Sequence, residues 1–333
     1  DIHFGVYEFF RNEAMDANDW FAKAAGQPRA PERHHDFGGY VGGPIVRGKT
    51  FFFLSYEGAN LRLPQTTIIQ VPSTAARQSA PASLATFLNA YPQPNGPVSP
   101  NGFTAQFTGS YSNTALLNAG SVRIDHSLSN RHSIFGRYSE APSDFTQRIN
   151  ALSQLQSTEV KTRTLTVGTN LVLSDRISNA IRGNYSQQSA ELRSSLDTFG
   201  GAQLPDPTAF LGGLSPTRNA GGFFAIGTNL YQSGPVANNR ARQLNFVDDL
   251  SISAGLHQMK IGGDYRAIFL DQKPADNSVL FIAPSVQTFL STGRVNVSAN
   301  TTRAGRILSQ SLSLYGQDTW KATSKLTITY GLR

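Results

Sequence analysis

The stretch from Thr162 to Gln187, TRTLTVGTNLVLSDRISNAIRGNYSQ, alternates between two kinds of side chain on both sides of a short turn. On the first arm, every second residue belongs to a mostly apolar set, namely Arg163, Leu165, Val167, Thr169, Leu171 and Leu173. After the turn at 174–176, the apolar set continues with Ile177, Ile181 and Tyr185. Successive residues of a strand point to opposite faces, so the stretch predicts a β-hairpin with one apolar and one polar face.

Similar hairpins recur along the chain. Comparable tight turns fall at residues 46–49, 129–131, 254–257 and 321–324. Segments rich in Gly, Asn, Pro and Ser, which we expect to be long loops, cover residues 61–120, 190–240 and 271–306. The count is about eleven strands, all joined by hairpin connections. Short turns at one end and long loops at the other are typical of an antiparallel, up-and-down transmembrane β-barrel.

This connectivity predicts how turns and loops are distributed, because each tight turn returns the chain to the same side. One rim should hold the turns near Arg47, Asn130, Asp175, Gly255 and Thr323. The opposite rim should hold the loops around Asn95, Pro205 and Ala283. Short helices are expected within residues 13–25 and 73–90, and neither is long enough to cross over between parallel strands.

The composition agrees with a barrel wall. The chain has 333 residues with a mean hydropathy of −0.27, and it has no apolar run long enough for a membrane-spanning helix. A barrel wall can be this polar because only alternate residues face lipid. There is no cysteine, which excludes a disulfide framework and a thiolate site. The net charge of +7 is spread along the chain without a dense basic run, so we expect no nucleic-acid partner.

The two faces of the strands should meet different surroundings. The apolar residues predicted to face outward, toward lipid, include Leu165, Val167, Leu171, Ile181, Leu244, Phe246, Ile261, Leu312, Leu314 and Ile328. The opposite face carries Arg123, Asp125, Arg137 and Arg182 at neighbouring wall positions. A closed soluble core would exclude these charges, whereas a water-filled lumen accommodates them.

Aromatic residues gather near the predicted strand ends, where a barrel has its interfacial girdles. The alternative for these rings is the core of a soluble sandwich. The set comprises Tyr7, Phe9, Phe10, Phe51, Phe52, Phe53, Tyr56, Tyr138, Tyr185, Tyr265, Trp320 and Tyr330.

Residues 43–50, GPIVRGKT, match the phosphate-binding P-loop pattern formally. The P-loop binds phosphate because its backbone amides lie at the start of a helix. Here the pattern is followed by Phe51-Phe52-Phe53, which favours a strand. We therefore interpret the segment as a turn, with Gly48 supplying the special dihedral angles, and expect no nucleotide binding.

The other candidate sites are also weak. His34 and His35 point to opposite faces of a strand, so they are poorly placed to share a metal ion with Asp36. His126 falls at an outward position near a turn. The carboxylates Asp125, Asp248, Asp249 and Asp264 are interpreted as partners of lumenal arginines, not as an acid–base pair. We expect no catalytic residue, cofactor or metal, and the sequence identifies no ligand-binding residue.

Several of these segments resemble the barrel of TonB-dependent outer-membrane receptors of the Oar-like type. The more specific cluster is YEFFRN at 7–12, FGGYVGGPI at 37–45, KTFFF at 49–53 and YEG at 56–58. Later hairpins show RIDH at 123–126, FGRY at 135–138, YGQDTW at 315–320 and YGLR at 330–333. The resemblance implies a 22-stranded barrel that is plugged by an N-terminal domain and energised by TonB.

From the resemblance we expect residues 1–333 to be a partial barrel domain, about half of the whole, with the plug and the C-terminal strands outside it. The implied location is the outer membrane of a Gram-negative bacterium, and the implied partners are outer-membrane lipid, lipopolysaccharide, an unknown extracellular ligand and, through the missing N-terminal region, TonB. The expected function is transport of that ligand. Two alternatives stay open: a non-transporting adhesion or assembly protein of the outer membrane, and a soluble β-rich carbohydrate-binding domain.

Overall fold

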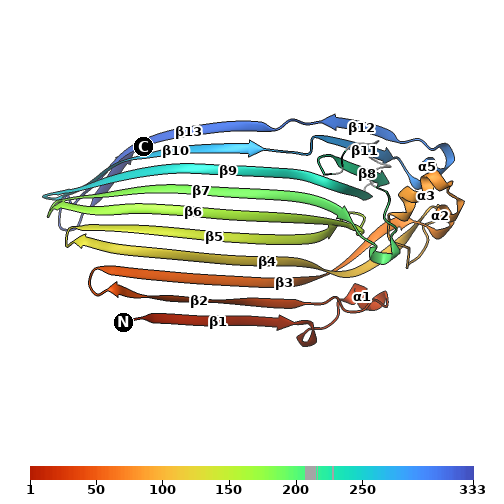
Figure 1. Ribbon diagram of the computed structural model, residues 1–333, viewed down its shortest axis with the longest axis horizontal. Helices are drawn as coiled ribbons and strands as arrows, with labels where there is room; N and C mark the ends of the chain where they lie inside the picture. Colours follow the sequence, from red (N-terminus) through yellow and green to blue (C-terminus); the bar gives the residue numbers. More distant parts are fainter. Residues whose placement is uncertain (207–214, 216, 227–228) are drawn as a thin grey trace.

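Eleven strands, of which all but β14 (Ile328–Leu332) have at least ten residues, follow one another in nearly unbroken chain order across one open, curved sheet (Figure 1). The computed structural model describes residues 1–206, 215, 217–226 and 229–333. Every neighbouring pair in this main sheet is antiparallel. The strands are β1 (His3–Asn12), β2 (Arg33–Val46), β3 (Thr50–Pro72), β4 (Thr104–Ser129), β5 (His132–Ile149), β6 (Gln154–Ser174), β7 (Ile177–Leu196), β9 (Asn229–Ala254), β10 (His257–Gln272), β13 (Gly305–Trp320) and β14 (Ile328–Leu332).

The tight turns lie together at one rim, as predicted. The backbone N–H of Val172 donates to Arg131 O at 2.8 Å, and that of Ser253 donates to Arg176 O at 2.7 Å. Arg131 also forms an ion pair with Asp175 at 3.4 Å, which joins the β4–β5 turn to the β6–β7 turn. The predicted loops meet at the other rim, where the amide of Gln93 donates to Gly200 O at 2.8 Å.

A small second sheet, joined to the main sheet by the pairing of β8 (Ala220–Ile226) with β9, and the short helices also gather at this loop rim (Figure 1). The second sheet departs from the predicted all-antiparallel pattern, because β11 (Asn277–Ala283) runs parallel to β8. No helix among the described residues is long and apolar enough to cross a membrane. These elements are η1 (Glu13–Met15), α1 (Trp20–Ala24), α2 (Thr74–Ser79), α3 (Ala82–Asn89), η2 (Phe199–Gly201), β8 (Ala220–Ile226), β11 (Asn277–Ala283), α5 (Val286–Thr292) and β12 (Asn296–Thr301).

The predicted long loops are shorter than expected, because the strands continue well into them. β3 runs to Pro72 and β4 starts at Thr104, so much of the 61–120 segment is strand. β7 likewise extends to Leu196, and β9 begins at Asn229. Beyond the apolar belt the outward face is mostly polar, whereas inward residues such as Val71 on β3 and Phe107 on β4 are apolar and buried in a core at the loop rim. The alternation that marks a half-lipid-exposed strand therefore disappears although the backbone pairing continues.

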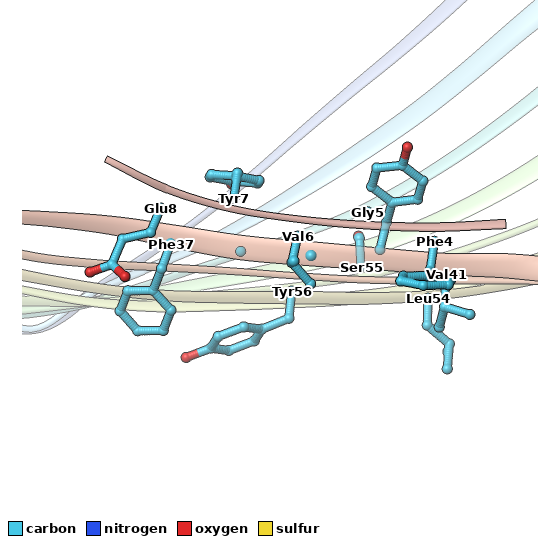
Figure 2. A pocket seen from close by; sticks show the side chains of 13 residues that line it. Phe4, Gly5, Val6, Tyr7, Glu8, Phe37, Val41, Leu54, Ser55 and Tyr56 are labelled. Carbon is cyan, nitrogen blue, oxygen red and sulfur yellow. The ribbon is translucent and has the colours of Figure 1, made fainter. Parts of the chain in front are cut away.

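The apolar face of the main sheet is exposed, as predicted. Leu165, Val167, Leu244, Phe246, Ile261, Leu312, Leu314 and Ile328 are all exposed, whereas Leu171 and Ile181 are half-buried. Figure 2 shows the same face at β1–β3: Phe4, Val6, Phe37, Val41, Leu54 and Tyr56 project away from the rest of the sheet. Exposed apolar side chains on the convex face are what a lipid-facing wall requires.

The aromatic residues do not all belong to this outer face. Phe10, Phe52, Tyr56, Tyr138, Tyr185, Tyr265, Trp320 and Tyr330 lie on it, because the strand registers place them level with the outward apolar residues. Tyr7, Phe9, Phe51 and Phe53 lie on the inner face, which corrects the girdle prediction. The run Phe51-Phe52-Phe53 must alternate faces, so it cannot lie entirely at the lipid interface.

Glycines in the strands lie under aromatic rings of the neighbouring strand. A Cβ built on Gly5 would lie 2.7 Å from the Tyr40 ring, and one on Gly168 would lie 2.5 Å from the Phe135 ring. The same arrangement pairs Gly262 with Tyr315. A ring laid over a glycine covers backbone that lacks its own side chain, and this packing pins the register between strands.

We expect Gly262→Ala to destabilise the barrel by roughly 1–3 kcal/mol, the usual cost of overpacking. The new Cβ would meet the Tyr315 ring at 2.5 Å and Asp248 O at 2.6 Å. Gly263→Ala is the matched control, since its Cβ would find Leu314 at an ordinary 3.4 Å. Denaturant unfolding of both variants in lipid vesicles measures the difference, and equal stabilities would contradict the packing described here.

Candidate functional site

The inner face of the sheet carries a charged network close to the turn rim. Asp249 on β9 is buried and accepts from Arg182 on β7 at 3.2 Å and from Lys260 on β10 at 3.1 Å. The Tyr315 hydroxyl on β13 also donates to this carboxylate. Four neighbouring strands are thus tied together by one side chain, and all of these groups face the lumen side.

A second carboxylate, Asp264 on β10, extends this network. Its side chain accepts from Asn245 at 2.5 Å and pairs with Arg266 at 3.8 Å and with Arg333 at 3.7 Å. Gly262 pairs in register with Asp249, and Asp264 is two residues farther along β10. Asp264 therefore lies on the same face as Asp249, one side-chain row closer to the loop rim. The two aspartates therefore compensate part of a larger set of cations on this wall.

Two arginines stand directly opposite each other farther along the same face. Arg123 on β4 pairs in register with Arg137 on β5, an arrangement that ordinarily destabilises a sheet. Asp125 binds the Arg123 guanidinium and so directs it away from Arg137, with Nε–Oδ2 and Nη2–Oδ1 distances of 2.8 and 2.7 Å. The guanidinium also lies over the Phe135 ring, 4.3 Å from its centroid. Arg137 is exposed and has no ion-pair partner among the described residues.

Above the charged level the inner wall is lined by small polar side chains. Thr164 on β6 lies in one row with Ser139 and Ser186, and Ser55 and Ser121 continue the row on β3 and β4. The hydroxyls of Ser55 and Ser121 are 2.7 Å apart. Short hydroxylated side chains leave the lumen wide and provide both donors and acceptors to water or a polar solute.

A packed cap closes over the inner face at the loop rim. Its core joins Leu88 and Tyr91 from the α2–α3 segment to Phe107 on β4, Phe224 on β8 and Phe289 on α5. Phe107 shares its strand face with Arg123, so the cap lies over the polar, lumenal side. The sequence analysis predicted only the helices of this cap. Its side chains come from segments far apart in the sequence, and they meet because the sheet brings these segments to the same rim.

Arg77 is the charged anchor of this cap. Its guanidinium donates to the backbone oxygens of Pro72, Tyr91 and Pro92 at 3.1, 3.2 and 2.7 Å. Burial lowers the pKa of Arg77 to about 10. Three carbonyl acceptors without a carboxylate still satisfy the cation, and they hold the last turn of α2 to the end of β3 and to the chain beyond α3.

The predicted carboxylate roles are largely confirmed. Asp125, Asp249 and Asp264 pair with arginines on the inner face. Asp248 does not, because it lies level with Ile181 on the outer face and accepts from Asn179 at 2.5 Å. The adjacent pair Asp248–Asp249 must alternate faces, so only one of the two can reach the lumen.

The three histidines considered above do not form one site, because His126 lies far from the adjacent pair His34–His35. His126 lies on the outer face near the turn rim, as predicted, and its Nδ1 is 2.8 Å from Thr50 Oγ1. His34 and His35 occupy consecutive strand positions on β2, and His35 contacts Glu8 at 3.2 Å. Among the described residues, no three His, Asp or Glu side chains are grouped closely enough to hold a metal ion.

The P-loop-like segment is the β2–β3 hairpin. β2 ends at Val46, Gly48 has a φ of +71°, and β3 begins at Thr50. The backbone amides that would cradle phosphate at a helix start are instead engaged in sheet pairing and a turn. The segment therefore has the shape of a hairpin turn at the rim.

Lys49→Ala is expected to leave folding unchanged, because Lys49 is an exposed turn residue. Titration of the purified protein with ATP should show no saturable binding before or after the change. ATP affinity that disappears in this variant would overturn the hairpin interpretation.

A lipid-facing outer wall, a polar inner wall, short turns at one rim and a capped opposite rim define a wall section of an outer-membrane β-barrel. The chain belongs to the outer membrane beta barrel domain family, whose model matches residues 1–86 and 78–333. This membership places the chain in the outer membrane of a Gram-negative bacterium, and it disfavours a soluble carbohydrate-binding domain.

Solved structures share the fold at low identity, and no curated protein matches the sequence. The outer membrane transporter YddB from Escherichia coli is 10% identical, with a TM-score of 0.60 over 98% of this chain and 38% of YddB. The ferric-catecholate import receptor Fiu from Escherichia coli K12, in its closed form, is 11% identical, with a TM-score of 0.52 over 99% of this chain and 46% of Fiu. The copper transporter OprC is 8% identical, with a TM-score of 0.51 over 99% of this chain and 39% of OprC. The chain therefore spans less than half the length of each.

Proposed function

We propose that this chain forms part of the barrel of a TonB-dependent receptor of the Oar-like type, and that the whole protein moves a ligand across the outer membrane. The observation that carries the proposal is the inner wall. Its charged network and hydroxyl rows face a lumen, while the other face of the same strands is apolar. Such a two-faced wall encloses a polar passage through lipid.

The fold likeness to YddB, Fiu and OprC supports a transport role, since these proteins are described as transporters or an import receptor. In this proposal the lumenal groups act by binding and positioning the ligand. The ligand, the plug, and the contact with TonB through a segment outside these residues are part of the proposal.

We also propose that residues 1–333 form one partial barrel domain. The support is the open sheet: among the described residues β1 pairs only with β2, and β14 pairs only with β13. A wall in lipid needs partners for both edges, because unpaired backbone groups are costly there. Further strands of the whole protein would supply these partners.

The test of transport compares the native bacterium with a strain that lacks the gene and with its complemented form. The medium is sampled during growth by mass spectrometry, with and without a protonophore. We expect one class of solute to be depleted only when the gene is present and the proton gradient is intact. Unchanged uptake of every solute, together with loss of surface attachment, would favour the adhesion alternative.

A further inference from the structure

The outer face changes character where the apolar belt ends on the loop side. Leu244 and Phe269 are the last apolar residues of β9 and β10 on this face, and Leu308 is that of β13. The next outward positions are Arg242 on β9, Asp271 on β10 and Arg306 on β13. Arg242 lies in register with Phe269, whereas Asp271 and Arg306 lie one outward position above Phe269 and Leu308. The strands thus leave the hydrocarbon layer at this level.

Three arginines surround one carboxylate at this boundary. Asp271 pairs in register with Arg240 and with Arg306. Its side chain contacts Arg242 at 3.0 Å and Arg306 at 3.4 Å. Arg240 is exposed, and its guanidinium has no partner among the described residues. The cluster therefore has an excess of positive charge, and the Arg306 side chain is 89% exposed.

The neighbouring strands carry cations at the same level, but these are neutralised. Arg163 contacts Glu140 at 2.9 Å, and Lys161 is paired with Glu159. Both cations face outward, because Arg163 shares a strand face with Leu165. The excess charge is thus local to β9, β10 and β13, which lie side by side (Figure 1).

We propose that Arg240, Arg242 and Arg306 form a binding site for the phosphate groups of lipopolysaccharide on the outer wall of the barrel. The short turns of an outer-membrane barrel face the periplasm, so the loop side lies in the outer leaflet. The headgroups of that leaflet meet the wall where its apolar belt ends. Guanidinium groups bind phosphate through paired hydrogen bonds, and Asp271 orients two of the three arginines.

The site rests on the outer-membrane location and not on transport, so its test is independent of the proposed function. Basic residues near a charged membrane surface contribute about fivefold each in affinity, which corresponds to about 1 kcal/mol. Arg240→Gln with Arg306→Gln should therefore weaken lipopolysaccharide binding on the order of twentyfold. This double variant keeps the Arg242–Asp271 ion pair, so the carboxylate is not left alone.

The experiment uses the full-length protein purified in detergent and incubated with phosphorylated or dephosphorylated lipopolysaccharide. Bound lipid is quantified by native mass spectrometry. The matched control, Lys161→Gln with Arg163→Gln, removes the same amount of positive charge at the same level. Circular dichroism and heat-modifiable gel mobility show whether each variant is folded. If the double variant misfolds, the single variant Arg306→Gln replaces it in the binding measurement.

The expected result is a large loss for the Arg240/Arg306 variant, a small loss for the control, and weak binding of the dephosphorylated lipid to the wild type. Equal losses in both double variants would show non-specific attraction to the membrane surface and would overturn the site. Equal binding of the two lipid forms would overturn the phosphate assignment.

Discussion

Replacement of Val167 by arginine is expected to lower the free energy of unfolding of the lipid-inserted protein by about 2–4 kcal/mol, the cost of a cation near the bilayer midplane. Val167 lies on the exposed apolar face of β6, in register with Gly136 and Gly183. These glycines offer no polar group to a guanidinium. The side chain is also several residues from the turn rim, which limits its escape toward water.

Thr164→Arg is the control for this prediction. Thr164 lies on the same strand but on the inner face, between Ser139 and Ser186. An arginine there meets hydroxyls and water, so we expect little loss of stability. Urea unfolding in vesicles of defined lipid compares the two variants. A similar cost at both positions would contradict the assignment of lipid-facing and lumenal sides.

The 333 residues expressed alone are expected to aggregate instead of forming a stable membrane-inserted species. β1 and β14 are the edges of the main sheet, and β14 carries exposed Ile328, Tyr330 and Leu332. Open edges bind other strands, and in lipid each unpaired backbone group costs several kcal/mol. Size-exclusion chromatography after refolding into detergent should show polydisperse material.

The full-length protein is the control for this second prediction, because the further strands proposed above would pair with both edges. We expect the full-length protein to be monodisperse and to show heat-modifiable mobility. A monodisperse, inserted species formed by these residues alone would mean that the edges find partners within the chain or in a second copy of it.

Much of the fold followed from alternation. The Thr162–Gln187 hairpin and its repeats predicted the eleven strands of the main sheet, their order and the common rim of their turns. The prediction was possible because lipid on one side and water on the other impose a two-residue period that is visible in a single sequence. Arg123, Asp125 and Arg137 were assigned to the lumen on the same grounds.

Alternation does not identify strands or their faces where the two sides of the sheet no longer meet lipid and water, or where neighbouring residues are of the same type. Above the apolar belt the outward faces of β3, β4, β7 and β9 are mostly polar and no longer alternate with an opposite character inside, so sequence reasoning assigned these paired strands to loops. In the Phe51–Phe53 run every residue is apolar, and in Asp248–Asp249 both are acidic, so the residue types do not show which face each takes. Backbone register decides these positions.

The amino-acid sequence by itself determined the class of the protein, the two faces of its wall and the turn rim, since each depends on the local period of the strands. Tertiary structure alone decided the contacts between distant residues. Asp249 joins Arg182, Lys260 and Tyr315, and Arg77 anchors the cap. Such contacts depend on how separate strands are aligned and how loops fold back over the rim, and neither leaves a periodic signal along the chain.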